Sequence, residues 1–202
     1  MPAQSGYPRA GQPGPANTPG EAELAGPAVR QRRAAASGLR LAQAACVAGL
    51  AYAAISVYWA LGGTWLLDTI GGTLEQQGRA GNPGIILAVW AAAVLKIIGA
   101  IVPLAAAGVT PGQATTAWMR QMRVLAWLEA AILTVYGLAL TGAGLLVQSG
   151  AIVSAAGADH RALAWHAYLW DPWFLLWGVL VTASLVRSRQ PRAARVAPSR
   201  SR

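Results

Sequence analysis

Four long apolar runs constrain this chain more than any other feature of its sequence. An α-helix rises about 1.5 Å per residue, so about 20 apolar residues cross the roughly 30 Å hydrocarbon core of a bilayer. Each run reaches that length and contains few charged residues. We therefore predict an all-α membrane protein with four transmembrane helices. Their expected ranges are 39–61, 84–107, 122–148 and 162–187.

The composition agrees with this class and excludes others. Hydrophobic residues make up 55% of the chain and charged residues 11%, against about a quarter charged in soluble domains. The net charge is +9, but the basic residues flank the apolar runs and do not line one face, so we expect the lipid bilayer as partner and no nucleic acid. The single cysteine, Cys46, excludes an intrachain disulfide and thiol-based redox chemistry.

The two ends of the chain differ in composition from the middle. Residues 1–37 are rich in Pro, Gly, Ala and Gln and show no apolar periodicity, so they cannot bury enough surface to offset their ordering entropy. We expect a disordered tail there, a transmembrane domain over 38–188, and a second, basic tail over 189–202.

The arginines predict how the helices are oriented. With four crossings, the two tails and the loop between the second and third runs share one side, which holds five, six and two Arg; the other side holds only Arg79 and Arg161. The positive-inside rule then predicts a multi-pass plasma-membrane protein with both termini in the cytoplasm. A cleaved signal peptide is the alternative, from Arg32-Arg33 and an A-x-A pattern at 51–53. Because the apolar run continues past that pattern to an aromatic pair, we favour a retained helix.

The fourth run contains Asp171-Pro172, a pair typical of an N-cap followed by proline at the first helical position. The segment 172–186 alone covers only about 22 Å. Either the helix continues through a kink at this pair, or residues 162–170 lie along the membrane interface; we favour the kink. Small residues predict close helix contacts in two other runs, at Ala45, Gly49 and Ala53 and at Gly137, Thr141 and Gly144.

Two ionisable residues, Lys96 and Glu129, lie within predicted spans. Such residues are costly in a bilayer and usually have a partner. We estimate that the two lie about 6 Å apart along the bilayer normal on neighbouring antiparallel helices, which a lysine side chain can bridge. The first interpretation is a structural intramembrane ion pair. The alternatives are an ion, proton or ligand site, and a lysine that snorkels independently.

A second group of residues gathers at the external ends of the first and fourth helices. We interpret this group either as an aromatic belt with Asp171 as a helix cap, or as the mouth of an aromatic and acidic pocket for an apolar molecule. His166 and Asp171 are five residues apart and are not expected to share a helix face. A metal would need a third ligand, for which Asp68 is the obvious residue, and we expect no metal. The candidate pocket residues are Tyr58, Trp59, Gly62, Gly63, Trp65, Asp68, His166 and Asp171.

The string YWALGGTW at 58–65 and the later Trp165-His166 and WDPW at 170–173 carry a resemblance. The chain resembles an uncharacterised family of small bacterial four-helix membrane proteins, the domain-of-unknown-function family numbered 3995, over roughly 39–187. The resemblance implies a four-helix membrane protein and no assigned activity, and it transfers no catalytic residue. If the members of the family share a functional site, the residues of these motifs are its natural candidates.

No phosphate-binding loop, H-E-x-x-H, C-x-x-C or G-x-S-x-G motif is present, and we expect no cofactor. The leading hypothesis is a binding or accessory protein that uses the external pocket or associates with another membrane protein. The alternative is a small transporter or proton-coupled protein that uses Lys96 and Glu129. The third is a membrane enzyme in which His166, with Asp68 or Asp171, acts on an apolar substrate.

Overall fold

The computed structural model describes residues 26–109, 114–155 and 157–188, and these are helical apart from short connections. Four helices are long and apolar enough to cross a membrane, as predicted. The long elements are α2 (Pro27–Ala60), α4 (Pro83–Ala106), α5 (Thr116–Gln148), and the consecutive helices α6 (His160–Trp165), η2 (His166–Trp170) and α7 (Asp171–Arg187). Residues 1–25 of the first predicted tail and all of the second, 189–202, lie outside the described residues.

Local sequence explains where these helices begin and end. The Asn82 side chain caps α4 by accepting from the backbone N–H of Gly84 at 2.9 Å, and Pro83 occupies the first turn. α2 ends at a Schellman turn: Gly62 has a φ of +90°, and the Gly63 N–H donates to the Tyr58 carbonyl at 2.9 Å. The helix therefore ends at this glycine pair.

Two helices begin earlier than the sequence predicted. α2 begins at Pro27 and not near 39, so residues 27–37, which were expected in the disordered tail, are helical. Proline favours the first helical position, and the Arg and Ala residues that follow are good helix formers. α5 begins at Thr116 and not near 122, because the Thr115 side chain caps it by accepting from the Trp118 N–H.

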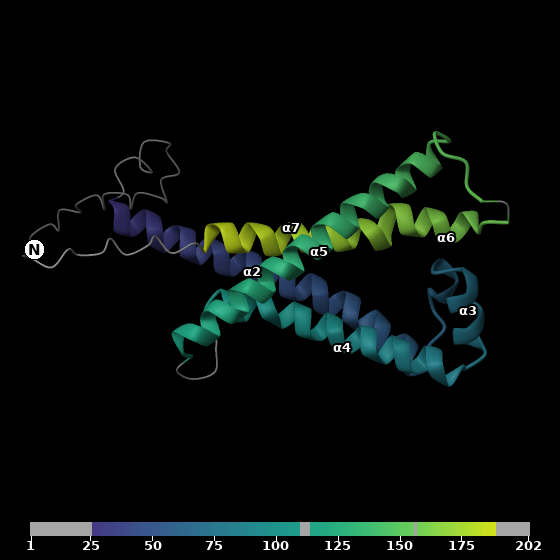
Figure 1. The fold of residues 1–202 in the computed structure, drawn as a ribbon, viewed down its shortest axis with the longest axis horizontal. Coiled ribbons are helices and arrows are strands. Elements are labelled where there is room, and N and C mark those ends of the chain that lie inside the picture. The colour runs from purple at the N-terminus through teal and green to yellow at the C-terminus, as the bar shows by residue number, and fades with distance from the viewer. Residues whose placement is uncertain (1–25, 110–113, 156, 189–202) are drawn as a thin grey trace, which may run out of the picture.

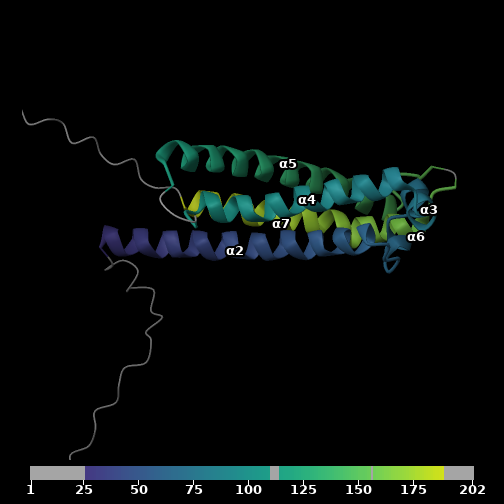
Figure 2. The same cartoon turned by 90° about the horizontal axis from the view of Figure 1, so that it is seen from below.

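The helices pack through small residues, as predicted. α5 packs chiefly against α7, and α2 against α4 and α7. Figures 1 and 2 show α5 crossing α7 obliquely while α2 and α4 run side by side. A Cβ at Gly49 would meet the Trp177 ring at 2.6 Å and the Ala100 side chain at 2.8 Å, so the Gly49 stripe is used within this chain.

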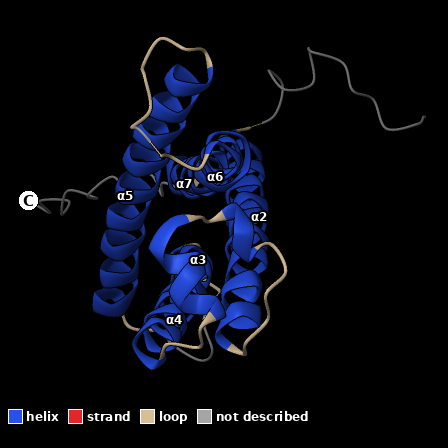
Figure 3. Cartoon of the chain, turned by 90° about the vertical axis from the view of Figure 1, so that its right-hand side faces the viewer, coloured by secondary structure: helices blue, strands red, loops and turns tan. Residues whose placement is uncertain are grey.

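The two ends of the bundle are built differently. The start of α2 and the end of α7 lie together, where Arg187 donates to the Ser37 hydroxyl at 3.0 Å (Figure 1). The opposite end carries a 3₁₀ turn, η1 (Leu67–Thr69), and a short helix, α3 (Gly72–Arg79). Figure 3 shows α3 lying across that end, between α2 and α4. Among the described residues, η1 and α3 thus cover one end of the bundle, and no helix lies across the other, which we call the open end.

Candidate functional site

A cavity of about 480 Å³ lies beneath α3, between α2 and α4, with η2 on one side. Its walls are mainly apolar and aromatic, with polar groups at its inner end and at its mouth. The residues that line it are Tyr52, Ser56, Trp59, Gly62, Gly63, Thr64, Leu67, Ile70, Leu74, Gly78, Arg79, Gly81, Ile85, Ile86, Ala88, Val89, Ala92, Lys96, His166 and Trp170.

Lys96 lies at the inner end of this cavity. Its ammonium donates to the Ser56 hydroxyl at 2.7 Å and lies 4.1 Å from the centre of the Tyr52 ring. Because Gly49 packs beside Ala100, Ser56 lies nearer the covered end of the bundle than Lys96 does. The lysine side chain therefore extends toward α3 and the cavity, and not toward the open end of the bundle, where the predicted pairing would have it reach.

Glu129 lines a second cavity, of about 290 Å³, together with Lys96, Phe174 and Trp177. Within the part of the chain that the structure describes, neither oxygen of its carboxyl group has a hydrogen-bond partner, and the buried Trp177 indole nitrogen has none either. Lys96 and Glu129 thus share a cavity, but within the described residues they form no direct ion pair, because the ammonium is bonded to Ser56. Lys96 and Ala92 line both cavities, so the two cavities meet at this part of α4.

The motif at the end of α2 holds the connecting loop in place. The Trp59 indole N–H donates to the Trp65 carbonyl at 2.9 Å, and the Trp65 N–H donates to the Tyr58 hydroxyl at 3.3 Å. A Cβ at Gly63 would lie 2.3 Å from the Tyr58 ring, so only glycine fits there. Of these residues Trp59 and Gly63 line the cavity with Gly62, whereas Tyr58 and Trp65 lie outside it.

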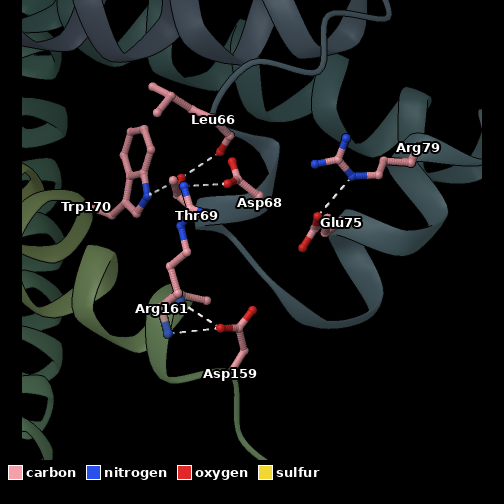
Figure 4. Close-up of polar contacts among 9 residues, drawn as sticks. Leu66, Asp68, Thr69, Glu75, Arg79, Asp159, Arg161 and Trp170 are labelled. Atoms are coloured by element: carbon pink, nitrogen blue, oxygen red, sulfur yellow. Dashed lines mark hydrogen bonds and ion pairs between the residues drawn. The ribbon is translucent and has the colours of Figure 1, made fainter.

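A buried polar contact joins this loop to the fourth helix. The Trp170 indole N–H donates to the Thr69 hydroxyl at 3.1 Å, and that hydroxyl donates to the Leu66 carbonyl at 2.6 Å (Figure 4). Leu66 has a left-handed backbone, with a φ of 61°, which a branched side chain adopts at a cost. The contact holds this strained residue, and Trp170 also stacks on Tyr52 at 5.6 Å between ring centres.

The expected acidic character of the pocket is not found. Asp68 pairs with Arg161 at 2.8 Å, Asp171 lies against His166, and neither lines the cavity. Among the described residues, no Asp or Glu lines it, and its fixed charges are the cations Lys96 and Arg79. The pocket is therefore aromatic and basic. The physical reason is that Asp68 pairs with Arg161, and Asp171 lies behind His166, whose imidazole lines the cavity in its place.

The sequence reasoning was wrong about His166 and Asp171. Their side chains meet, with 3.5 Å between His166 Nδ1 and Asp171 Oδ1, because the helix makes a π turn there and the Asp171 N–H donates to the His166 carbonyl five residues back. Pro172 has no N–H and its ring disfavours the ordinary α-helical bond, which accounts for the π turn. Asp171 is also no N-cap, because helix precedes it and its side chain caps nothing.

His166 faces the cavity, so this pair presents an imidazole to any bound molecule. The fourth helix is continuous through the π turn, so the kinked continuation is preferred to a separate interfacial segment. Within the described residues, no three His, Cys, Asp or Glu side chains gather closely enough to hold a metal ion.

Sequence reasoning missed several residues of the site. Tyr52 and Ser56 are buried one turn apart on α2, facing the predicted position of Lys96, and this spacing was a signal that could have been found. Thr69 and Arg79 carried no such signal, because their roles depend on how η1 and α3 fold over the helix ends.

Comparison with known proteins gives one family. No curated protein and no solved structure matches the chain. A family model described as "Protein of unknown function (DUF3995)" matches residues 49–181, a shorter part of the chain than the resemblance suggested. Because that match covers well over half of the chain, the protein belongs to this family of unknown function.

Proposed function

We propose that this membrane protein binds a small apolar or amphiphilic molecule in the cavity beneath α3. The observation that carries the proposal is the cavity itself: about 480 Å³, walled by apolar and aromatic side chains, with a few polar groups at its two ends. Small-molecule sites have volumes of roughly 300–1,000 Å³ and this mixture of walls and polar groups. An accessory role beside another membrane protein is compatible with such a site.

A matched pair of substitutions on α4 tests this proposal. Val89 lines the cavity, whereas Leu87 is 71% exposed on the outer surface of the helix. Val89→Trp should fill the cavity and abolish saturable binding of an apolar fluorescent probe to the protein in nanodiscs, while Leu87→Trp should leave binding unchanged. Small molecules that co-purify with the parent should likewise be lost only from Val89→Trp. Equal binding by both variants would refute the proposal.

The second candidate is proton-coupled transport through Lys96 and Glu129. The observation that favours it is that Lys96 lines both cavities while the Glu129 carboxyl group, in the second cavity, has no hydrogen-bond partner. An ionisable group in that position is a proton or ion site by default. Proteoliposomes that contain a pH-sensitive dye should then show proton movement that Glu129→Gln abolishes without loss of folded protein. Proton movement that survives this change would exclude the candidate.

The third candidate, a membrane enzyme, is favoured only by the contact between His166 and Asp171 at the cavity wall. A carboxylate on one ring nitrogen orients an imidazole as a general base. Asp171→Asn should then abolish turnover of an apolar substrate while binding in the cavity persists. Unchanged turnover in this variant would exclude the enzyme.

We propose further that the protein lies in the plasma membrane with both termini in the cytoplasm. The support is the distribution of arginines, thirteen on the side of the termini and two, Arg79 and Arg161, on the other. The covered end of the bundle would then face the exterior, and the cavity would open there. Cysteine-accessibility labelling of intact cells at positions in α3 tests this arrangement, since labelling only after cell lysis would reverse it.

A further inference from the structure

The charges around the main cavity have one sign. Its lining contains the ammonium of Lys96 at the inner end and the guanidinium of Arg79 on α3, and within the described residues no carboxylate lines it. Arg79 already has a partner, since its Nε lies 2.9 Å from the Glu75 carboxylate. Of the two cations, only Lys96 is without a carboxylate in contact.

The contacts of the Lys96 ammonium are all neutral. An ammonium has three N–H donors, and among the described residues one of them is used, in the bond to the Ser56 hydroxyl at 2.7 Å. The Tyr52 ring, 4.1 Å away, takes one side of the cation through its π face. Ser56 and Tyr52 are both buried, so the ammonium lies in a largely desolvated environment. In that environment, contact with an anion stabilises the ammonium more than the same contact would in water.

The depth of Lys96 determines how such an anion would lie. Lys96 is about 20 Å along α4 from the first residue of that helix, Pro83. The residues of α4 between them that line the cavity are apolar, namely Ile85, Ile86, Ala88, Val89 and Ala92. An anion at the inner end would therefore be joined to an apolar chain that points toward α3.

We propose that the cavity binds an amphiphile with one small anionic group, which pairs with the Lys96 ammonium while the apolar part lies against the α4 wall. This inference rests on the proposed function and names its ligand class. Glu129 shares the second cavity with Lys96, but within the described residues the two side chains form no ion pair, so Glu129 does not supply the ammonium with a carboxylate partner. A carboxylate from a free fatty acid and a phosphate from a lipid headgroup share this chemistry.

The test compares three molecules that have the same chain and different head groups. The full-length protein in phosphatidylcholine nanodiscs is photolabelled with a decanoate that carries a diazirine on its chain, and unlabelled decanoate, decanol and decylamine compete for the site. Decanoate should compete at least about tenfold better than decanol, since a hydrogen bond to a charged group corresponds to about that factor or more. Decylamine should compete least, because its charge repels the ammonium.

Variants assign this preference to the lysine. Lys96→Met, which keeps the length of the side chain and removes its charge, should make decanoate and decanol compete equally. Lys96→Arg should retain a preference for decanoate. Arg161→Gln removes an exposed cation that does not line the cavity, and it should change the preference less than about threefold because exposed charges act weakly. Equal competition by decanoate and decanol in the parent protein would overturn the inference even if no Lys96 variant folds.

The outcomes separate the ligand class from the binding function. If no compound competes and Val89→Trp leaves photolabelling unchanged, the proposed function itself fails. If decanol competes as well as decanoate and Val89→Trp abolishes labelling, the cavity binds an apolar molecule and only the anion is wrong. Displacement of the probe by phosphatidylglycerol in the nanodisc would support the inference and identify the lipid headgroup as the source of the anion. Decanoate-selective competition without such displacement would also support the inference and identify a free carboxylic acid as the source.

Discussion

Replacing Gly137 with alanine should separate the two most closely packed helices. A Cβ at this position of α5 would lie 2.4 Å from the backbone nitrogen of Leu175 on α7 and 2.7 Å from its Cα. Favourable contacts need about 3.5 Å, so the helices must move apart by about 1 Å. Overpacking destabilises a protein by about 1–3 kcal/mol, and we expect the upper end here because the contacted atoms belong to the backbone and cannot rotate away. The higher helix propensity of alanine offsets about 1 kcal/mol of this loss.

We therefore expect Gly137→Ala to lower the free energy of unfolding by about 2 kcal/mol. Reversible unfolding of the purified protein in mixed detergent micelles, followed by tryptophan fluorescence, measures this. Gly142 on the same helix is the matched control, because a Cβ there meets nothing within 4 Å. Gly142→Ala should be neutral or stabilise the protein by up to about 1 kcal/mol.

A second glycine at the same crossing sharpens the test. A Cβ at Gly178 on α7 would lie 2.6 Å from the Thr134 nitrogen on α5. Once one alanine has moved the helices apart, the second costs less, so the double variant with Gly137→Ala should be destabilised by less than the sum of the single effects. If Gly137→Ala were as stable as Gly142→Ala, or if the two losses simply added, the described contact between α5 and α7 would be refuted.

Three further predictions concern the covered end and the orientation of the chain. Thr69→Val should destabilise the protein by about 1–3 kcal/mol in the same unfolding assay, because it leaves the buried Trp170 N–H without its acceptor; Thr69→Ser, which keeps the hydroxyl, should cost less. Asp68→Asn should change stability by less than about 1 kcal/mol, since its partner Arg161 is largely exposed; a larger loss would mean that this pair organises the site. A reporter fused to the C-terminus should be active only in the cytoplasm, and a signal from the exterior would reverse the orientation.

The helices were largely predictable from the sequence because their causes are local. Apolar length predicted four spans, and local residues account for where helices begin and end, such as the Asn82 cap with Pro83 and the Gly62-Gly63 pair. The early start of α2 at Pro27 was missed, since a polar, arginine-rich turn beyond the apolar run has no membrane signal.

The candidate site was predictable only as a list of residues. Of the predicted pocket residues, Trp59, Gly62, Gly63 and His166 line the cavity, and their role in binding stays a prediction. The sign of the pocket's charge was not predictable, because Asp68 is neutralised by an arginine ninety-three residues later in the chain, after α6 begins. A local sequence pattern cannot show which distant residue will lie beside a given side chain.

The sequence by itself determined that this chain is a bundle of four membrane-crossing helices, because the hydrophobic effect and the geometry of the backbone act on each run separately. Only the tertiary structure decided that Lys96 bonds to Ser56, forty residues away, and that a π turn joins His166 to Asp171. The reason is that these contacts depend on how each helix is rotated and shifted against its neighbours, which apolar length leaves undetermined.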